Sequence, residues 1–186
     1  MPINLTERQI LNFLPLVRPG LEKYLWIQHQ ASLGPSRIAD PDFQRRFSGF
    51  YKVRRNAEWR NGYFQLLASK LQSGISFRDA LKSILDLTCR HEASFVSKLV
   101  ATINATKPVI DSWVLENVGL KLPAAHHSNR FLGICDVYAS LELEFKTFLA
   151  LELGRYLVIQ FRGHYPDADV TEVKMLDLIL WQTRPE

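Results

Sequence analysis

Apolar residues recur at helical spacing through most of this chain. Between residues 94 and 103 they fall at i, i+1, i+4, i+5 and i+8, which places them on one face of a helix; they are Phe95, Val96, Leu99, Val100 and Ile103. A second stripe of apolar residues predicts a long helix over residues 57–72. No segment alternates between apolar and polar residues as a half-buried strand does. The pattern therefore predicts an all-α protein, one globular domain over residues 1–186 with about eight to ten helices.

Prolines and glycines divide the N-terminal third into short elements. A capping box at Thr6–Gln9 opens a helix. Pro15 and the Pro19-Gly20 pair are expected to end it and to separate it from a second helix over residues 21–30. The Asp40-Pro41 pair then predicts a third, short helix.

Polar residues with a preference for N-cap positions mark the later helices. Asn56, Ser76 and Thr171 each precede an apolar helical pattern and are predicted to cap it. Residues 129–161 are compatible with helix almost throughout, with a break expected near Gly133 or Ser140.

The segment from 94 to 120 contains an acidic residue at the predicted start of a helix. Pro108 keeps the preceding residue out of the helical region and so ends the first helix of this segment. Asp111 then stands directly before a short apolar helix, with Gly119 placed to end it. The simplest interpretation of Asp111 is that of an N-cap.

The excess positive charge of the chain is concentrated in one segment. The net charge is +4 over 186 residues, of which 47% are hydrophobic and 23% charged. The segment from Gln44 to Arg60 holds six cations against one anion, a net charge of +5, so the remaining residues together carry −1. In this segment aromatic residues are interleaved with arginine, which suits contacts with phosphate groups and bases. The alternative is that these arginines are solvated or pair with acids elsewhere.

Several other functions lack a sequence signal. No apolar run approaches the roughly 20 residues needed to span a bilayer, and no secretory signal is visible at the start, so we expect a cytoplasmic protein. Cys89 and Cys135 are isolated, which predicts free thiols. His126 and His127 have no third ligand at a metal-binding spacing. The chain has no glycine-rich phosphate loop and no GxSxG or HExxH motif, so we expect neither metal nor cofactor.

The segment from Ser94 to Gly119 resembles the later half of the signature of the helix-hairpin-helix DNA glycosylases, in particular the branch of the 8-oxoguanine glycosylases. Ala101–Asn104, Pro108–Asp111 and Val114 occupy the places of that motif. The resemblance implies a helix-hairpin-helix glycosylase-like fold and the excision of a damaged or modified base that has been flipped out of DNA.

The chain departs from that signature at the hairpin. The family carries a glycine-rich turn there, whereas this chain has Leu87–Ser94 without glycine. The lysine nucleophile of bifunctional members would fall near His91–Ala93, where there is none, and Lys98 lies on the side of its helix away from the apolar stripe. The resemblance therefore implies a monofunctional enzyme that leaves the abasic site intact.

The resemblance and the residue types together give a set of predicted site residues. Asp111 is the predicted catalytic acid, which stabilises a cationic sugar or deprotonates water. The predicted DNA-binding cations are Lys52, Arg54, Arg55, Arg60, Arg90 and Lys98. The predicted residues for base stacking or the base pocket are Tyr51, Trp59 and Trp113, although core packing is the simpler role for both tryptophans.

Two alternatives to an active enzyme stay open. One is a catalytically inactive glycosylase-like domain that binds nucleic acid or a protein partner. The other is an unrelated helical interaction module in which Asp111 is only a cap.

Overall fold

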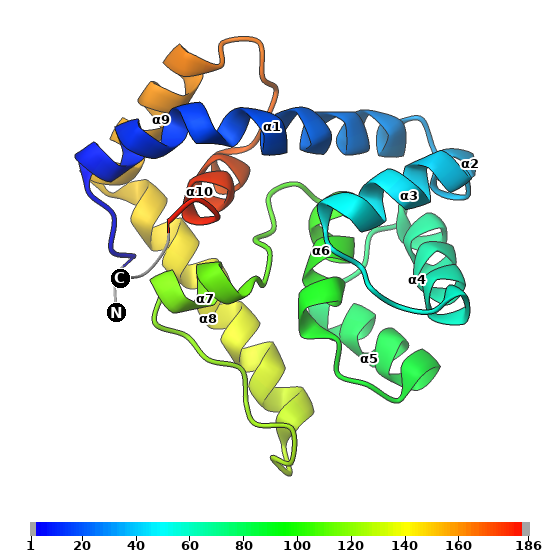
Figure 1. Ribbon diagram of the computed structural model, residues 1–186. Helices are drawn as coiled ribbons and strands as arrows, with labels where there is room; N and C mark the ends of the chain where they lie inside the picture. Colours follow the sequence, from blue (N-terminus) through cyan, green and yellow to red (C-terminus); the bar gives the residue numbers. More distant parts are fainter. Residues whose placement is uncertain (1–2, 184–186) are drawn as a thin grey trace. The chain divides into compact units, whose positions relative to one another are not determined.

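The computed structural model describes residues 3–183, which contain ten helices and no strand (Figure 1). The predicted all-α class is confirmed. The helices are α1 (Glu7–Ser32), α2 (Pro35–Ile38), α3 (Pro41–Phe50), α4 (Ala57–Lys70), α5 (Phe77–Thr88), α6 (Ala93–Ile103), α7 (Ser112–Asn117), α8 (Arg130–Ala150), α9 (Glu152–His164) and α10 (Glu172–Leu180). None of these helices is long and apolar enough to cross a membrane.

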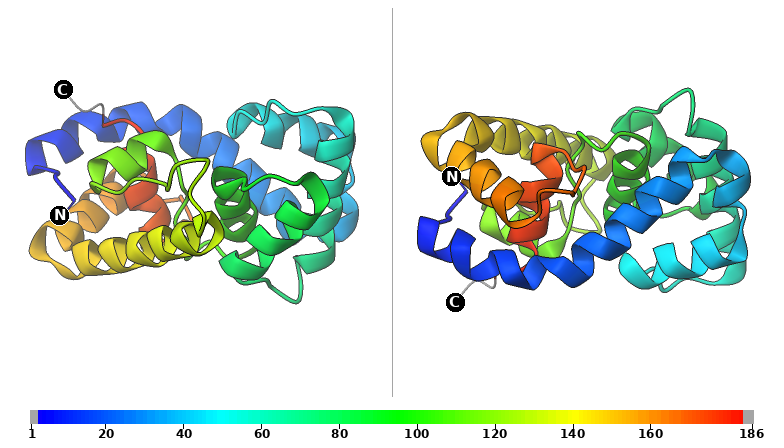
Figure 2. Two further views of the ribbon diagram at one scale, coloured as in Figure 1. Left: turned by 90° about the horizontal axis from the view of Figure 1, so that it is seen from below. Right: turned by 90° about the horizontal axis from the view of Figure 1, so that it is seen from above.

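The chain forms two compact units. Unit 1 comprises Met1–Leu21 and Ala105–Glu186, and unit 2 comprises Glu22–Asn104. In unit 1, α10 packs against α7, α8 and α9 (Figure 2). In unit 2, α4, α5 and α6 pack against one another, and α2 contacts both α3 and α4. The single domain over residues 1–186 stays a prediction.

α1 is one helix of 26 residues, so the prediction of two helices separated at Pro15 and Pro19 is wrong. Both prolines lie within it and both are exposed. Its buried side passes through them in helical register, with Ile10, Leu14, Val17, Leu21, Tyr24, Ile27 and Ala31. A proline inside a helix costs about 3 kcal/mol, whereas each large apolar side chain contributes about 1.5 to 3 kcal/mol on burial. Burial of the stripe therefore outweighs the two prolines.

Three predicted N-caps are confirmed. The side chain of Asn56 accepts a hydrogen bond from Trp59 N at 2.9 Å, at the start of α4. The side chain of Ser76 accepts a hydrogen bond from Asp79 N at 3.1 Å at the start of α5, and that of Thr171 accepts one from Lys174 N at 3.2 Å at the start of α10. Each cap satisfies an amide that the helix itself leaves without a partner.

The break between α8 and α9 lies at Leu151, not near Gly133 or Ser140 as the sequence suggested. The reason is a close backbone approach at Gly154. A Cβ atom on this glycine would lie 2.1 Å from the carbonyl oxygen of Phe148 and 2.6 Å from Cα of Leu149. The start of α9 can therefore fold back onto the end of α8 only where the side chain is a hydrogen atom.

From Lys174 to Leu180, α10 is buried on every side, including at two charged residues. Lys174 and Asp177 form an ion pair at 2.5 Å, and the Lys174 ammonium lies 5.0 Å from the centre of the Trp181 ring. The sequence pattern placed Asp177 beside the apolar stripe, with no indication that it is buried. A charged side chain inside a protein needs a partner of opposite charge, because an isolated buried charge is very costly.

We expect Gly154→Ala to lower the free energy of unfolding by at least about 2 kcal/mol, because the new methyl group collides with backbone that cannot move aside. Urea unfolding monitored by circular dichroism measures this. Gly163→Ala, in the same helix with no atom near its Cβ position, is the control and should raise stability by up to about 1 kcal/mol. Equal effects of the two changes would contradict this account of the break.

Candidate functional site

The loop between α3 and α4 carries two of the predicted DNA-binding arginines. Its turn closes with a hydrogen bond from Val53 N to Ser48 O at 2.9 Å. Lys52 adopts a left-handed backbone conformation with φ of 54°, which reverses the chain. Arg54 and Arg55 follow, directly before the Asn56 cap of α4. The turn before Arg54 and the cap after Arg55 thus hold the backbone on both sides of these two arginines.

The loop between α5 and α6, residues 89–92, carries Arg90, another of the predicted DNA-binding cations. Cys89 ends α5 in the left-handed conformation, with φ of 54°, and its N–H donates to Leu85 O at 2.7 Å. Cys89 thus has the backbone conformation that glycine adopts without strain. Arg90 and Glu92 complete the loop.

Side chains from both loops line one polar pocket of about 490 Å³ in unit 2, which we call the arginine pocket. Its lining residues are Arg54, Arg55, Asn56, Glu58, Trp59, Leu87, Thr88 and Arg90. Three of the six predicted DNA-binding cations therefore meet here with Trp59. The pocket holds three cationic side chains and one anionic side chain, so it attracts anions.

The three arginines of the pocket differ in their partners. Arg55 forms a two-pronged ion pair with Glu92, Nε to Oε1 at 3.0 Å and Nη2 to Oε2 at 2.9 Å. The Arg55 and Glu92 side chains are 31% and 11% exposed. Arg54 and Arg90 are exposed, and neither has an ion-pair partner within residues 3–183. No pattern in the sequence points to Glu92, because it lies 37 positions after its partner.

Lys52 and Arg60 are exposed and lie outside the lining of the arginine pocket. Lys98 is only 6% exposed; its Nζ donates to Ser94 Oγ at 2.9 Å and lies 3.4 Å from Tyr51 O. The prediction of Lys98 as a surface DNA contact therefore does not fit its place. Its position off the apolar stripe did not keep it at the surface, because the chain at Tyr51 packs over it.

Two predicted stacking residues belong to the core of unit 2. Tyr51 is 2% exposed, and its ring packs 4.7 Å from that of Phe47. Trp59 is 8% exposed and stacks on Tyr63 at 5.0 Å. Neither presents an open ring face for a base to stack on, so the core-packing alternative describes Trp59 better.

Asp111 lies in unit 1 and caps α7, as predicted. Its Oδ1 accepts a hydrogen bond from Trp113 N at 3.0 Å. Gly119 has a positive φ of 67°, consistent with its predicted place just after the helix. Asp111 is half-buried, and its Oδ2 accepts no hydrogen bond within the part of the chain described. One carboxylate oxygen thus serves the helix while the other stays available. Trp113 is half-exposed beside it in the chain.

The segment before Asp111 is held firmly in unit 1. Val109 and Ile110 are buried, and the hydroxyl of the buried Tyr138 donates to Pro108 O at 3.2 Å. Burial, with a smaller effect of nearby acids, raises the pKa of Tyr138 far above its usual range, so the phenol stays protonated and can donate. No sequence pattern pointed to Tyr138, because helical spacing does not connect it to residues 30 positions earlier.

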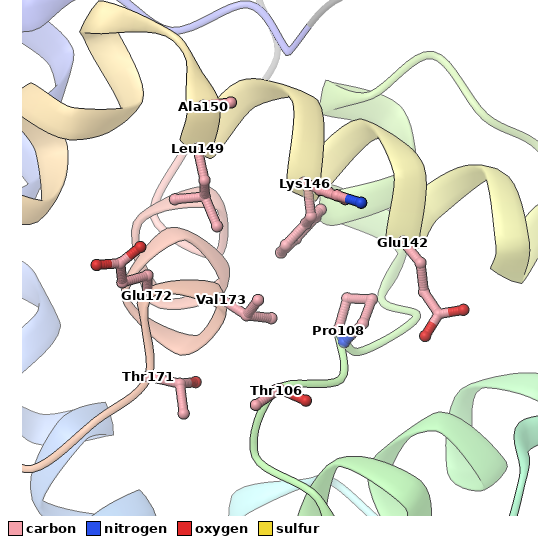
Figure 3. A pocket seen from close by; sticks show the side chains of 10 residues that line it. Thr106, Pro108, Glu142, Lys146, Leu149, Ala150, Thr171, Glu172 and Val173 are labelled. Atoms are coloured by element: carbon pink, nitrogen blue, oxygen red, sulfur yellow. The ribbon is translucent and has the colours of Figure 1, made fainter.

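Unit 1 also contains a cavity of about 630 Å³ between the 106–108 segment, α8 and the start of α10 (Figure 3). Its apolar lining includes Pro108, Leu149 and Val173, and the carboxylates of Glu142 and Glu172 lie at opposite edges in Figure 3. Both acids are already paired, Glu142 with Lys107 at 2.7 Å and Glu172 with Arg162 at 3.1 Å. None of the predicted site residues lines this cavity. Within residues 3–183, no three His, Cys, Asp or Glu side chains gather as metal ligands.

No protein-family model, curated protein or solved structure matches this chain. The functional assignment therefore depends on the chemistry and geometry of the chain's own residues.

We expect Asp111→Ala to lower the free energy of unfolding by about 1 kcal/mol, because the first turn of α7 loses its cap. Asp111→Asn keeps an oxygen that can accept the Trp113 N–H, so it should cost only a few tenths of a kcal/mol. Thermal unfolding of both variants measures the difference. An equal loss in the two would show that the charge of Asp111, not its capping bond, stabilises the helix.

Proposed function

We propose that this protein binds DNA through the arginine pocket and excises a flipped base with the carboxylate of Asp111, as a monofunctional glycosylase does. The observation that carries the proposal is the meeting of Arg54 and Arg90, from two loops far apart in the sequence, in one anion-attracting pocket. Two exposed arginines without an ion-pair partner are well suited to bind a phosphate.

The order of elements supports the glycosylase part of the proposal. α5 and α6 are joined by a loop of four residues, and the Pro108–Asp111 segment follows α6. That is the order of hairpin, helix and catalytic acid that the resemblance implies. Arg90 in the hairpin loop offers a side-chain contact to phosphate where the family uses glycine nitrogens.

The available oxygen of Asp111 suits the chemistry of base excision. The bond between C1′ and the base nitrogen breaks, and its electron pair leaves with the base. Positive charge then develops on the sugar, which the negative carboxylate stabilises. Water adds to C1′ and gives its proton to Asp111 as general base. That proton then passes through solvent to the base, which left as an anion, so that the Asp111 carboxylate is ionised again. The products are the free base and an intact abasic site.

We expect the protein to produce abasic sites in some member of a panel of DNA duplexes that each carry one lesion. Asp111→Asn should slow this reaction by a factor of about 10² to 10³, while the helix stays capped. Glu116→Gln, which removes an exposed carboxylate from the same helix, is the matched control and should leave the rate unchanged.

Borohydride should trap no covalent adduct in the same assay, because the hairpin loop carries no lysine. Full activity of Asp111→Asn would contradict the catalytic role. DNA binding without excision of any lesion would favour the alternative of a catalytically inactive domain that binds nucleic acid.

We expect the affinity for DNA to fall steeply with salt, because cationic side chains displace counterions from the phosphates. Replacing both Arg54 and Arg90 by alanine should reduce the slope of log K against log salt by about 0.9 for each phosphate that is no longer neutralised. Fluorescence anisotropy with a labelled duplex measures the slope. Lys70→Ala, at the far end of α4 and about 20 Å from its N-terminus, is the control. Binding that does not depend on salt would contradict the proposed interface.

A further inference from the structure

Arg55 uses all three of its guanidinium nitrogens inside unit 2. Nε and Nη2 donate to the two carboxylate oxygens of Glu92, and Nη1 donates to the carbonyl oxygen of Arg54 at 3.2 Å. The guanidinium carbon also lies 5.1 Å from the centre of the Phe95 ring and 6.0 Å from that of Trp59. A side chain held on so many sides is poorly placed to turn towards a ligand.

The same bonds connect the backbones of the two exposed arginines. Arg55 binds the carbonyl group of Arg54 on one loop and the side chain of Glu92 on the other. Glu92 in turn donates its N–H to Arg90 O at 3.1 Å, and Arg90 N donates to Thr88 Oγ1 at 3.3 Å. One continuous chain of hydrogen bonds therefore runs from Arg54 to Arg90 through Arg55 and Glu92.

We infer that Arg55 and Glu92 are positioning residues, which hold Arg54 and Arg90 at the spacing needed to bind one backbone phosphate of DNA between them. This inference rests on the proposed function. It assigns phosphate binding to Arg54 and Arg90 and a supporting role to the Arg55–Glu92 ion pair, which we call the brace. Arg54 and Arg90 contact the phosphate. Arg55, although the sequence pattern presents it as an equal cation, contacts Glu92 instead.

Charge attraction and the brace predict opposite effects of removing the Glu92 carboxylate. Glu92→Gln removes an anion from the neighbourhood of the pocket, so electrostatics alone predicts tighter binding of DNA. Loss of the brace predicts weaker binding, because the two loops are no longer joined by the charged pair and a rigid arrangement of the arginines is lost. The direction of the change therefore separates the two explanations.

The experiment measures the affinity of the full chain for a labelled, undamaged DNA duplex over a series of salt concentrations. Because Arg54 and Arg90 bind one phosphate between them, Arg54→Ala and Arg90→Ala should each lower the slope, and replacing both should lower it by about 0.9 and weaken binding about eightfold at 0.1 M salt. Glu92→Gln should weaken binding by a similar factor and lower the slope. Arg55→Lys, which keeps the charge but not the two-pronged geometry, should do the same. The double variant Arg55→Lys/Glu92→Gln should bind about as well as either single variant, because both changes break one interaction.

Asp86→Asn is the matched control, because it also removes one acid from an ion pair in unit 2, the exposed Lys82–Asp86 pair on α5. It should leave binding unchanged or make it slightly tighter. Thermal unfolding establishes that each variant is folded at the assay temperature. If Glu92→Gln does not fold, Arg55→Lys decides the question.

The experiment distinguishes a wrong inference about the brace from a wrong proposal of DNA binding. Binding by Glu92→Gln or Arg55→Lys that is as tight as that of the wild type, with an unchanged slope, overturns the brace and leaves the proposed DNA binding intact. A slope that falls on replacing Arg55 by lysine, but not on replacing Arg54 or Arg90 by alanine, makes Arg55 the ligand and overturns the division of roles. Absence of binding by the wild type at low salt overturns the proposed function and this inference with it.

Discussion

The constraint on which this structure depends is the burial of a continuous apolar face on each long helix. α1 keeps one buried stripe in register through two internal prolines, and its seven buried side chains outweigh the cost of both. α10 is buried from Lys174 to Leu180, so that two of its three charged residues, Lys174 and Asp177, lie inside, where they neutralise each other. Burial thus overrides local signals that, read alone, end a helix or place a residue at the surface.

Once the helices are packed, paired polar groups fix the segments between them. The Tyr138 hydroxyl holds the Pro108 carbonyl group, and the Arg55–Glu92 pair joins two loops of unit 2. Breaking either interaction leaves a polar group in a place where water cannot fully replace the partner, which costs more than the bond itself contributes. Interactions of this kind determine where the groups beside them, such as the exposed Arg54 and the half-buried Asp111, are presented.

The proposed chemistry uses groups that already have a structural role. Asp111 gives one oxygen to the helix cap, and its other oxygen accepts no hydrogen bond within residues 3–183. In the arginine pocket the division is between side chains: Arg55 stabilises the loops, while Arg54 and Arg90 stay exposed. A group that is already held by such a bond has fewer orientations to lose when a ligand arrives, so binding costs less conformational entropy. The cavity of unit 1, whose acids are both paired, offers no comparable set of available charges.

The sequence by itself determined the helical class, the caps at Asn56, Ser76, Thr171 and Asp111, and the position of the basic segment. These features depend on residues within one or two turns of each other, so local preference decides them. Tertiary structure alone decided that Lys98 is buried, that the chain breaks at Leu151, and that Arg55 pairs with Glu92 while Arg54 stays available. Each of these depends on where segments meet in space, such as the backbone of Phe148 against Gly154. Helical spacing carries no information about contacts between residues that the fold, and not the local sequence, brings together.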